Sequence, residues 1–355
     1  MKRVLITALG TMNCTTIVSE LRKHGGYYLI GADINPQYCI ATSREVDEYY
    51  QFPKATVDRE AYFEFVKSFC LEHKIDVYYC VVDEEVETMA KHRNELNAIG
   101  VKLCVANTDA VVICHNKDQF AEWSEKHIPA FTIKGFKRYE DVKDSDFPLF
   151  IKPIEGRASI GCRRIDNRTE LDAIRDSWQN YVVQECIDSK NDIVAVDIVR
   201  NKKTRQIEIA QRLELMRNSN GCGVAVEIVD IPEVKDACLK IAELLDINGV
   251  VNTEFFITDK GPKIIEVNPR LPAGIAYSCM AGLDVVMNAL RIAEGEPCIF
   301  SPIKVGSYYA KRYETFEMAN SINLKQNADN KPVTNLMGGG RIVLPIYAAY
   351  NRIAA

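Results

Sequence analysis

The first hundred residues alternate short apolar runs with segments of helical periodicity. The apolar runs, which we expect to be strands, cover residues 4–9, 28–32, 77–82 and 101–105. The helical segments between them cover residues 15–24, 61–73 and 84–96. Strands and helices in this order form parallel βαβ units, in which each strand is buried on both faces. This part of the chain is therefore expected to be an open-sheeted, Rossmann-like α/β domain.

The turn after the first apolar run does not carry the glycine pattern of dinucleotide-binding proteins. Gly10 is its only glycine, so G-x-G-x-x-G is absent and a dinucleotide-dependent oxidoreductase is disfavoured. Backbone amides of such a turn can still hold an anion, although a tight strand-to-helix turn explains Gly10 as well. Asp33 ends the second run, where it can contact a ribose or, more simply, cap the Asn35-Pro36 turn.

From about Asn107 the pattern changes to short helices and then to many strands. The expected helices cover residues 109–114, 117–126, 233–245 and 283–294. The expected strands cover residues 147–152, 181–185, 193–199, 207–215, 224–228, 250–257 and 262–267. Consecutive strands with short connections pair antiparallel, so this part is expected to be α+β.

The last strand pair predicts a metal site. Thr258–Gly261 is a good hairpin turn, so Glu254 folds back beside Glu266. Glu266 and Asn268 are two residues apart and point to the same face. Two carboxylates and an amide oxygen are hard ligands suited to Mg²⁺, although a solvated strand face is the simpler alternative. Arg270 follows two residues later, and a cation beside two metal carboxylates suits a triphosphate.

Two lysines and a loop fit the same chemistry. Lys152 ends an apolar strand, where its charge would be costly without an anionic partner. Lys117 begins a helix after Asn116. Residues 156–161 form a glycine- and serine-bearing loop whose amides can cover phosphates, but the loop alone is a weak signal and is not a P-loop.

Composition narrows the class of protein. The 355 residues are too many for one ordinary core, and the net charge of −5 is spread along the chain, which argues against a nucleic-acid partner. No apolar run approaches the length of a membrane span. The twelve cysteines are dispersed and favour neither disulfides nor zinc, so a reducing cytoplasm is expected.

In this order, the motifs resemble the ATP-grasp superfamily with its preceding Rossmann-like domain. They are most similar to the carbamoyl-phosphate-synthase-like and carboxylate–amine ligase branch. The matching pieces are Asn116-Lys117, Phe147–Pro153, Gly156–Gly161, Val183–Ile187, Glu254 and Ile265–Arg270. The last piece is the most specific. The resemblance implies a Rossmann-like domain at 1–106, linker helices and a small subdomain at 107–183, a large subdomain at 184–300, and a segment of unknown role at 301–355.

The resemblance also implies roles for single residues. Lys117 and Lys152 would contact the ATP phosphates. A lid carrying Gly156, Ser159 and Gly161 would close over them. A hinge strand would offer backbone groups to adenine, and its residues are Gln184, Glu185, Cys186 and Ile187. Asp192 would be the acidic residue at the ribose.

For catalysis, the resemblance implies that Glu254, Glu266 and Asn268 bind Mg²⁺, with Mn²⁺ as a substitute. Arg270 would meet the phosphates or an acyl-phosphate, together with Lys152. Arg212 lies where relatives contact the acceptor. Other candidates for substrate contacts are Arg217, the loop 218–223 and the acidic segment 83–85, for which surface salt bridges are the plain alternative.

The resemblance implies an ATP-dependent ligase. It would activate a small carboxylate as an acyl-phosphate and join it to an amine or ammonia, with release of ADP and phosphate. A small-molecule phosphotransferase on the same fold is the main alternative, and a nucleotide-sensing module without chemistry is another. No membrane partner is expected, and a homodimer is kept open.

Overall fold

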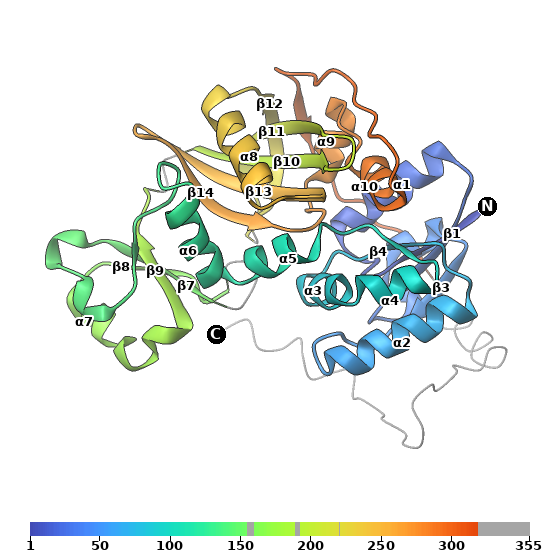
Figure 1. The fold of residues 1–355 in the computed structure, drawn as a ribbon, viewed down its shortest axis with the longest axis horizontal. Helices are drawn as coiled ribbons and strands as arrows, with labels where there is room; N and C mark the ends of the chain where they lie inside the picture. Colours follow the sequence, from blue (N-terminus) through green and yellow to red (C-terminus); the bar gives the residue numbers. More distant parts are fainter. Residues whose placement is uncertain (155–159, 189–191, 220, 319–355) are drawn as a thin grey trace. The chain divides into compact units, whose positions relative to one another are not determined.

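The computed structural model describes residues 1–154, 160–188, 192–219 and 221–318. Residues 1–314 form one compact unit. Within this unit, the described chain forms three sheets, of five, four and six strands (Figure 1). The metal ligands expected from the sequence lie on the six-stranded sheet.

The first sheet is parallel, as the alternating pattern predicts. Its strands run in the order β3-β2-β1-β4-β5. Their bounds are β1 (Lys2–Ile6), β2 (Tyr27–Asp33), β3 (Glu48–Gln51), β4 (Val77–Tyr79) and β5 (Lys102–Leu103). The accompanying helices are α1 (Met12–His24), α2 (Arg59–Glu72), α3 (Asp83–Lys91) and α4 (Arg93–Ala98). The Rossmann-like expectation is confirmed.

Several boundaries differ from those expected. The first strand ends at Ile6 because Ala8 has a φ of 53°, which no strand adopts, although Leu9 is still fully buried. The helix expected at 84–96 is interrupted at His92, whose ring stacks on Phe63. Strand β3 was not expected, because its sequence Glu-Tyr-Tyr-Gln is short and half polar.

Two helices, α5 (Thr108–His115) and α6 (Lys117–His127), lead to the second sheet. This sheet is antiparallel in the order β6-β9-β7-β8. Its elements are β6 (Gly135–Phe136), β7 (Leu149–Pro153), β8 (Arg163–Ile165), α7 (Arg168–Asp172) and β9 (Tyr181–Glu185). Short 3₁₀ turns lie at Gln37–Cys39, Ala41–Glu45, Tyr139–Asp141, Asp144–Asp146 and Arg175–Asn180.

The third sheet is antiparallel in the order β14-β13-β10-β11-β12-β15. Its strands are β10 (Asp192–Asn201), β11 (Gln206–Arg217), β12 (Gly223–Val229), β13 (Gly249–Thr258), β14 (Gly261–Asn268) and β15 (Tyr308–Ala310). Helices α8 (Pro232–Leu244), α9 (Ile275–Ala281) and α10 (Val285–Glu294) pack against it (Figure 1). The start of the 301–355 segment is part of the third sheet, because its strand β15 pairs antiparallel with β12 at the edge.

Three of the four segments expected as domains, 1–106, 107–183 and 184–300, contribute to a common hydrophobic cluster. This cluster runs from the parallel sheet through α5 and α6 to the third sheet, and it includes Leu5, Val111 and Val251. Gly249 has a φ of 142°, and a Cβ there would lie 2.6 Å from Ala106 Cα. The start of β13 therefore depends on a glycine at its contact with the N-terminal part.

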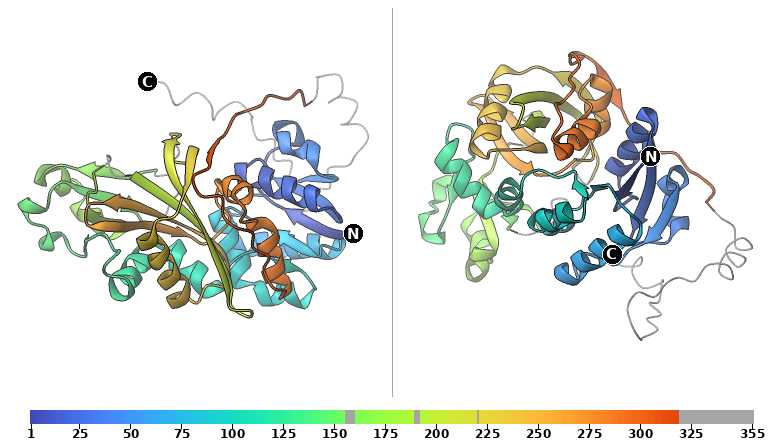
Figure 2. Two further views of the ribbon diagram at one scale, coloured as in Figure 1. Left: turned by 90° about the horizontal axis from the view of Figure 1, so that it is seen from above. Right: turned by 45° about the vertical axis from the view of Figure 1, so that its right-hand side comes forward.

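Helices α9 and α10 bring the third sheet against the N-terminal part. Both contact α1, and the two views of Figure 2 show α10 beside it. Among the described residues, no single helix is long and apolar enough to cross a membrane. The bent pair α9–α10 reaches that threshold by length and composition only.

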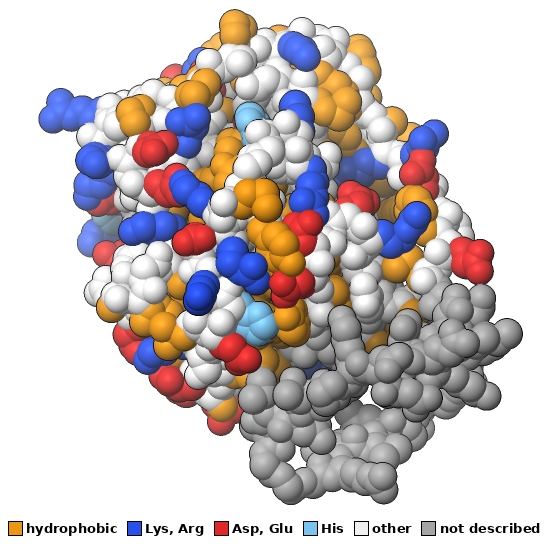
Figure 3. All heavy atoms as spheres, turned by 90° about the vertical axis from the view of Figure 1, so that its right-hand side faces the viewer, with side chains coloured by type: hydrophobic (Ala, Val, Ile, Leu, Met, Phe, Trp, Pro, Cys, Tyr) orange, Lys and Arg blue, Asp and Glu red, His pale blue; other side chains and the backbone are white. Residues whose placement is uncertain are grey.

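Charges of both signs are mixed on the surface shown in Figure 3. Lysine and arginine side chains lie next to aspartate and glutamate across its described part. This agrees with the even spread of charge along the sequence.

Candidate active site

The structure brings the three expected metal ligands together on one hairpin. Strands β13 and β14 pair so that Glu254 lies directly opposite Glu266. The Asn268 side chain donates to Glu266 Oε1 at 3.0 Å, so the two residues share a face. The turn at the hairpin's end sets the pairing as far as Phe255 and Ile264, and in that register Glu254 would lie opposite Ile265. A register shift between Glu254 and Phe255, which leaves Ile265 as the extra residue, brings Glu254 opposite Glu266.

This oxygen cluster carries unfavourable negative charge. Burial and the neighbouring negative charge of Glu266 together raise the pKa of Glu254 to about 8. Arg217 opposes this effect, because its Nη2 lies 3.0 Å from Glu254 Oε2. Two carboxylates that repel one another when bare, with an amide oxygen beside them, fit a hard divalent cation such as Mg²⁺.

Lys152 lies beside β14, the strand that carries Glu266 and Asn268. It projects from β7, and its Nζ donates to the Ile265 carbonyl at 3.3 Å, one residue before Glu266. Burial lowers the pKa of Lys152, and the positive charge of Lys117 contributes to the lowering, whereas Glu266 opposes it. Lys117 is the first residue of α6, after an N-cap at Asn116. The two lysines therefore act on one another electrostatically, as residues that bind one triphosphate would.

The expected hinge borders a pocket of about 600 Å³. Glu185, Cys186 and Ile187 line it on one side, and the hairpin turn between β13 and β14 lines it on another. The Glu185 amide donates to Lys134 and the Cys186 amide to Pro148, so both are used within the protein.

Three other predicted nucleotide residues lie on neighbouring strands or turns. Gln184 is buried within β9, opposite Phe150. Asp192 is exposed at the start of β10. Gly161 has a φ of 77°, which favours glycine, whereas the lid residues Gly156 and Ser159 lie outside the described residues.

The Arg270 side chain connects the turn after β14 to the N-terminal part of the chain. Its Nε donates to Asp83 Oδ1 at 2.5 Å, and its Nη2 lies 3.5 Å from Asn268 Oδ1. Asp83 begins α3, so the acidic segment suggested as a substrate contact instead supplies a partner for Arg270. Glu85, from the same segment, is enclosed: it accepts from Thr7 at 2.8 Å and from Tyr78 at 2.5 Å.

Arg212 differs from the other predicted catalytic residues because it is enclosed. Its side chain is 2% exposed, and its Nη1 lies 2.5 Å from Asp197 Oδ2 and 2.7 Å from Ser278 Oγ. A Cβ on Gly274 would lie 3.0 Å from its guanidinium. In this structure Arg212 ties β10 and β11 to α9 and does not face an open site, so the expected acceptor contact has no support here.

The turn after β1 has the simpler of its two expected roles. Asp33 is buried, and one of its oxygens accepts from the Gly10 amide at 2.9 Å. The other accepts from the Asn35 amide at 3.0 Å. Asp33 therefore caps the Asn35-Pro36 turn, as expected, and holds the turn at Gly10.

Sequence reasoning missed Lys311. This residue follows β15 and is half-buried, and its Nζ donates to the Ala273 carbonyl at 2.7 Å. It also lies 4.9 Å from the centre of the Tyr277 ring. The available signal was a lysine directly after the strand-like Tyr308-Tyr309-Ala310, but the position of that strand in the sheet is not encoded locally.

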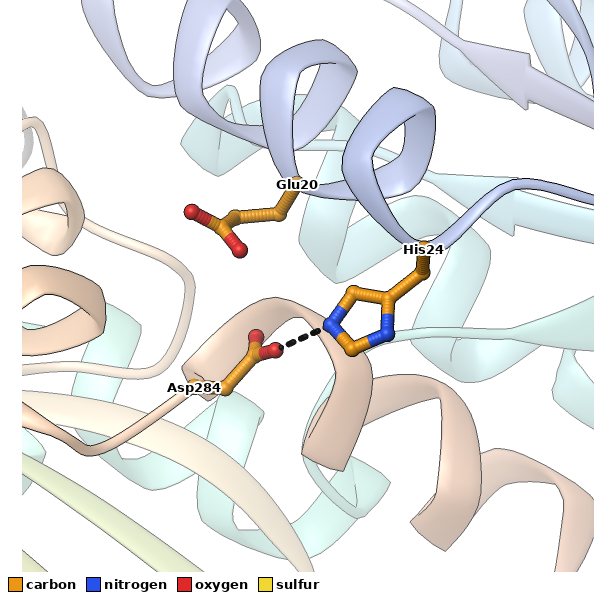
Figure 4. A group of neighbouring side chains, drawn as sticks. All are labelled: Glu20, His24 and Asp284. Atoms are coloured by element: carbon orange, nitrogen blue, oxygen red, sulfur yellow. Dashed lines mark hydrogen bonds and ion pairs between the residues drawn. The ribbon is translucent and has the colours of Figure 1, made fainter. Parts of the chain in front are cut away.

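A second group of ligand-type side chains lies where α1 meets α10 (Figure 4). Glu20, His24 and Asp284 present their nitrogen and oxygen atoms within 4.8 Å of one another. His24 Nε2 lies 2.9 Å from Asp284 Oδ2, and Lys23 Nζ lies 3.1 Å from Glu20 Oε2. Because each group already has a partner of its own, we interpret this as a polar contact between helices.

Comparison with known proteins finds family matches for two parts of the chain. Residues 4–104 match the PylC-like N-terminal domain. Residues 178–311 match a family described as ATP-grasp in the biosynthetic pathway with Ter operon.

Curated relatives are distant and longer. The carbamoyl phosphate synthase large chain of Thermoplasma acidophilum is 22% identical over 306 residues, covering 81% of this chain but 28% of the relative. The D-alanine–D-alanine ligase of Treponema denticola is 28% identical over 179 residues, covering 42% of this chain and 48% of the relative. The chain thus spans less than half the length of either.

A solved structure shows the same fold. The biotin carboxylase domain of the 2-oxoglutarate carboxylase of Hydrogenobacter thermophilus was determined as a dimer with MgADP, ADP and bicarbonate. It superposes with a TM-score of 0.68 at 17% identity, covering 86% of this chain and 73% of that one. The chain therefore joins a PylC-like N-terminal domain, matched over residues 4–104, to an ATP-grasp domain, matched over residues 178–311.

Proposed function

We propose that the protein is an ATP-dependent ligase that joins a small carboxylate to an amine or ammonia. The carboxylate is activated as an acyl-phosphate, and ADP and phosphate are released. The relatives described above support this class, because a D-alanine–D-alanine ligase and a carbamoyl phosphate synthase large chain are among them.

The observation that carries the proposal is the set of charges along β14 and the turn after it. Glu254 and Glu266 face one another with Asn268 beside them, Lys152 lies at one end, and Arg270 at the other. Mg²⁺ held by the three oxygen ligands would neutralise phosphate charge and orient the triphosphate. A site of this kind works by positioning and charge neutralisation and needs no enzyme nucleophile.

In the proposed reaction, an oxygen of the substrate carboxylate attacks the γ-phosphorus of ATP. The bond from that phosphorus to the β–γ bridging oxygen breaks, and ADP leaves. The amine nitrogen then attacks the acyl carbon, the bond from carbon to the phosphate oxygen breaks, and the nitrogen loses a proton. Lys152 and Lys117 hold the triphosphate, and Arg270 stabilises charge on the transferred group.

Three finer points belong to the same proposal. Mn²⁺ replaces Mg²⁺, because the ligands are all oxygens. The protein acts in the cytoplasm, which its twelve dispersed thiols support. It forms a homodimer, for which the support is the dimer formed by the biotin carboxylase domain described above.

The test measures ADP and phosphate release from the purified protein with MgATP and a panel of carboxylates and amines. Hydroxylamine is added in place of the amine, so that an acyl-phosphate is trapped as a hydroxamate. We expect turnover to require a carboxylate and an acceptor together. A phosphorylated small molecule that accumulates without phosphate release would favour the phosphotransferase, and AMP with pyrophosphate would contradict both.

A further inference from the structure

Lys311 is a half-buried cation whose described partners are all uncharged. Its Nζ donates to the Ala273 carbonyl and lies over the Tyr277 ring, and it forms no ion pair with a carboxylate among the described residues. Burial lowers the pKa of Lys311, and the charges of Glu214 and Asp197 oppose this effect without forming an ion pair with it. A buried ammonium in this state favours an anion from outside the chain.

The other cations near this end of the site already have carboxylate partners. Arg212 is paired with Asp197, Arg270 with Asp83, and Arg217 with Glu214 and Glu254. Lys311 therefore stands apart from them.

Lys311 and Lys152 are placed at opposite ends of one stretch of chain. Lys152 bonds the carbonyl of Ile265, before the metal ligands, and Lys311 bonds the carbonyl of Ala273, after Arg270. The stretch between these two carbonyls contains Glu266, Asn268 and Arg270. Along the chain, the expected metal ligands Glu266 and Asn268 therefore lie between the contact of Lys152 and the contact of Lys311.

The Lys311 end is also close to the metal ligands in space. Both Lys311 and Glu254 act on the pKa of the Cys222 thiol. Lys311 lowers this pKa, and Glu254 raises it. The backbone here is fixed, because the Lys311 amide donates to Val224 at 2.9 Å and the Tyr277 hydroxyl to the same carbonyl at 2.8 Å. The ammonium is therefore held in a defined place.

We propose that Lys311 binds the carboxylate of the small-molecule substrate and holds it for attack on the γ-phosphate. This proposal rests on the proposed ligase function and assigns a substrate contact to the segment that follows β15. Lys311 donates to one carboxylate oxygen, while the other oxygen is left to attack phosphorus.

The test compares Lys311→Met, which removes the charge but keeps the stem over Tyr277, with Lys311→Arg, which keeps the charge. Lys304→Met is the matched control, because Lys304 is exposed on the same segment and also donates to a carbonyl, that of Met280, at 3.1 Å. The probes are bicarbonate and the twenty common L-amino acids, each assayed singly with MgATP and hydroxylamine for hydroxamate. The most active probe is then used for KM and kcat.

We expect Lys311→Met to raise the KM for the probe about tenfold or more, as for loss of a charge-assisted hydrogen bond. Lys311→Arg should recover part of the loss, and Lys304→Met should match the parent protein. The affinity for a non-hydrolysable ATP analogue, measured by calorimetry, should change less than about twofold in all three.

Two outcomes separate the inference from the function on which it rests. If the parent protein forms hydroxamate and Lys311→Met keeps the parent KM, the role of Lys311 is wrong and the ligase function stands. If the parent protein forms no hydroxamate with any probe, competitive acetylation followed by mass spectrometry decides about Lys311. Protection of Lys311 but not Lys304 by a carboxylate probe with the ATP analogue supports the contact, and no protection by any probe overturns it.

Discussion

The two ends of the candidate site are built in different ways. At the nucleotide end, Lys152, Glu266 and Asn268 come from strands that their own sequence predicts, and the hairpin sets their geometry. At the other end, Arg270 meets Asp83, which lies 187 positions earlier in the chain, and Lys311 directly follows the added edge strand β15. The comparison teaches that the strands of the nucleotide end are encoded locally, whereas the surroundings of Arg270 and Lys311 depend on tertiary packing.

The largest expected effect is at the nucleotide end. Glu266→Gln keeps the side-chain volume but removes a negative charge from the metal ligands. We expect turnover to fall about a hundredfold or more, since changes even in the outer shell of a metal site cost up to that factor. Thermal unfolding should change little, because the substitution also relieves the repulsion with Glu254.

The control is Glu243→Gln, an exposed position on α8. It should leave both turnover and unfolding unchanged. Near-parental turnover in Glu266→Gln would show that Glu266 is not a metal ligand. The contrast between the two ends of the site would then no longer hold.

The next effect concerns the free energy of unfolding and the enclosed ion pair between Arg212 and Asp197. Arg212→Met leaves Asp197 buried without its partner and should cost about 3–5 kcal/mol in the free energy of unfolding. Asp197→Asn should also be costly, and the double variant should cost less than the sum of the two. Denaturant unfolding of the three variants measures this coupling. Additive losses would mean that the pair acts independently, and a stable Arg212→Met with lost turnover would restore the catalytic role expected from the sequence.

A smaller effect is expected for the phosphate lysine. Lys152→Ala should weaken binding of a non-hydrolysable ATP analogue about tenfold or more, or about 1.4 kcal/mol. Lys235→Ala on the exposed face of α8 is the matched control. Calorimetric titration in the presence of Mg²⁺ gives both affinities. An unchanged affinity in Lys152→Ala would show that Lys152 does not contact phosphate.

The pH dependence of metal binding gives the smallest effect. Because the pKa of Glu254 is raised to about 8 in the metal-free fold, a proton competes with the cation below that pH. Mg²⁺ affinity without nucleotide should therefore rise as pH increases from 6 and level off above about 8. The contribution of this carboxyl to folding has the opposite trend: it is present below its unfolded pKa and lost as pH rises through about 8.

Calorimetry between pH 6 and 9 in two buffers of different ionisation enthalpy measures both the affinity and the proton release. Glu254→Gln should bind Mg²⁺ weakly and without this slope. A flat profile in the parent protein would mean that Glu254 is ionised throughout and is not held in a repelling pair.

The sequence predicted the fold and the pairing of β13 with β14 because both rest on local periodicity and on a recognisable turn. Alternation of strand and helix gave the parallel sheet, whereas the register shift that brings Glu254 opposite Glu266 was not predicted. It did not predict that Arg212 would be enclosed, since a strand position does not tell which face α9 will cover. Lys311 was missed for the same reason: β15 has three residues, and its pairing with β12 is a long-range event.

The central claim is that Glu254, Glu266 and Asn268 hold a divalent cation against the ATP phosphates. A crystal structure with Mg²⁺ and a non-hydrolysable ATP analogue tests it most directly. We expect oxygens of all three side chains at about 2.1 Å from one or two ions, the usual Mg–O distance. Asn268 must then turn its amide oxygen, now 3.5 Å from Arg270 Nη2, towards the cation. If the three side chains lie more than about 5 Å from every ion, well beyond any coordination distance, the assignment is wrong.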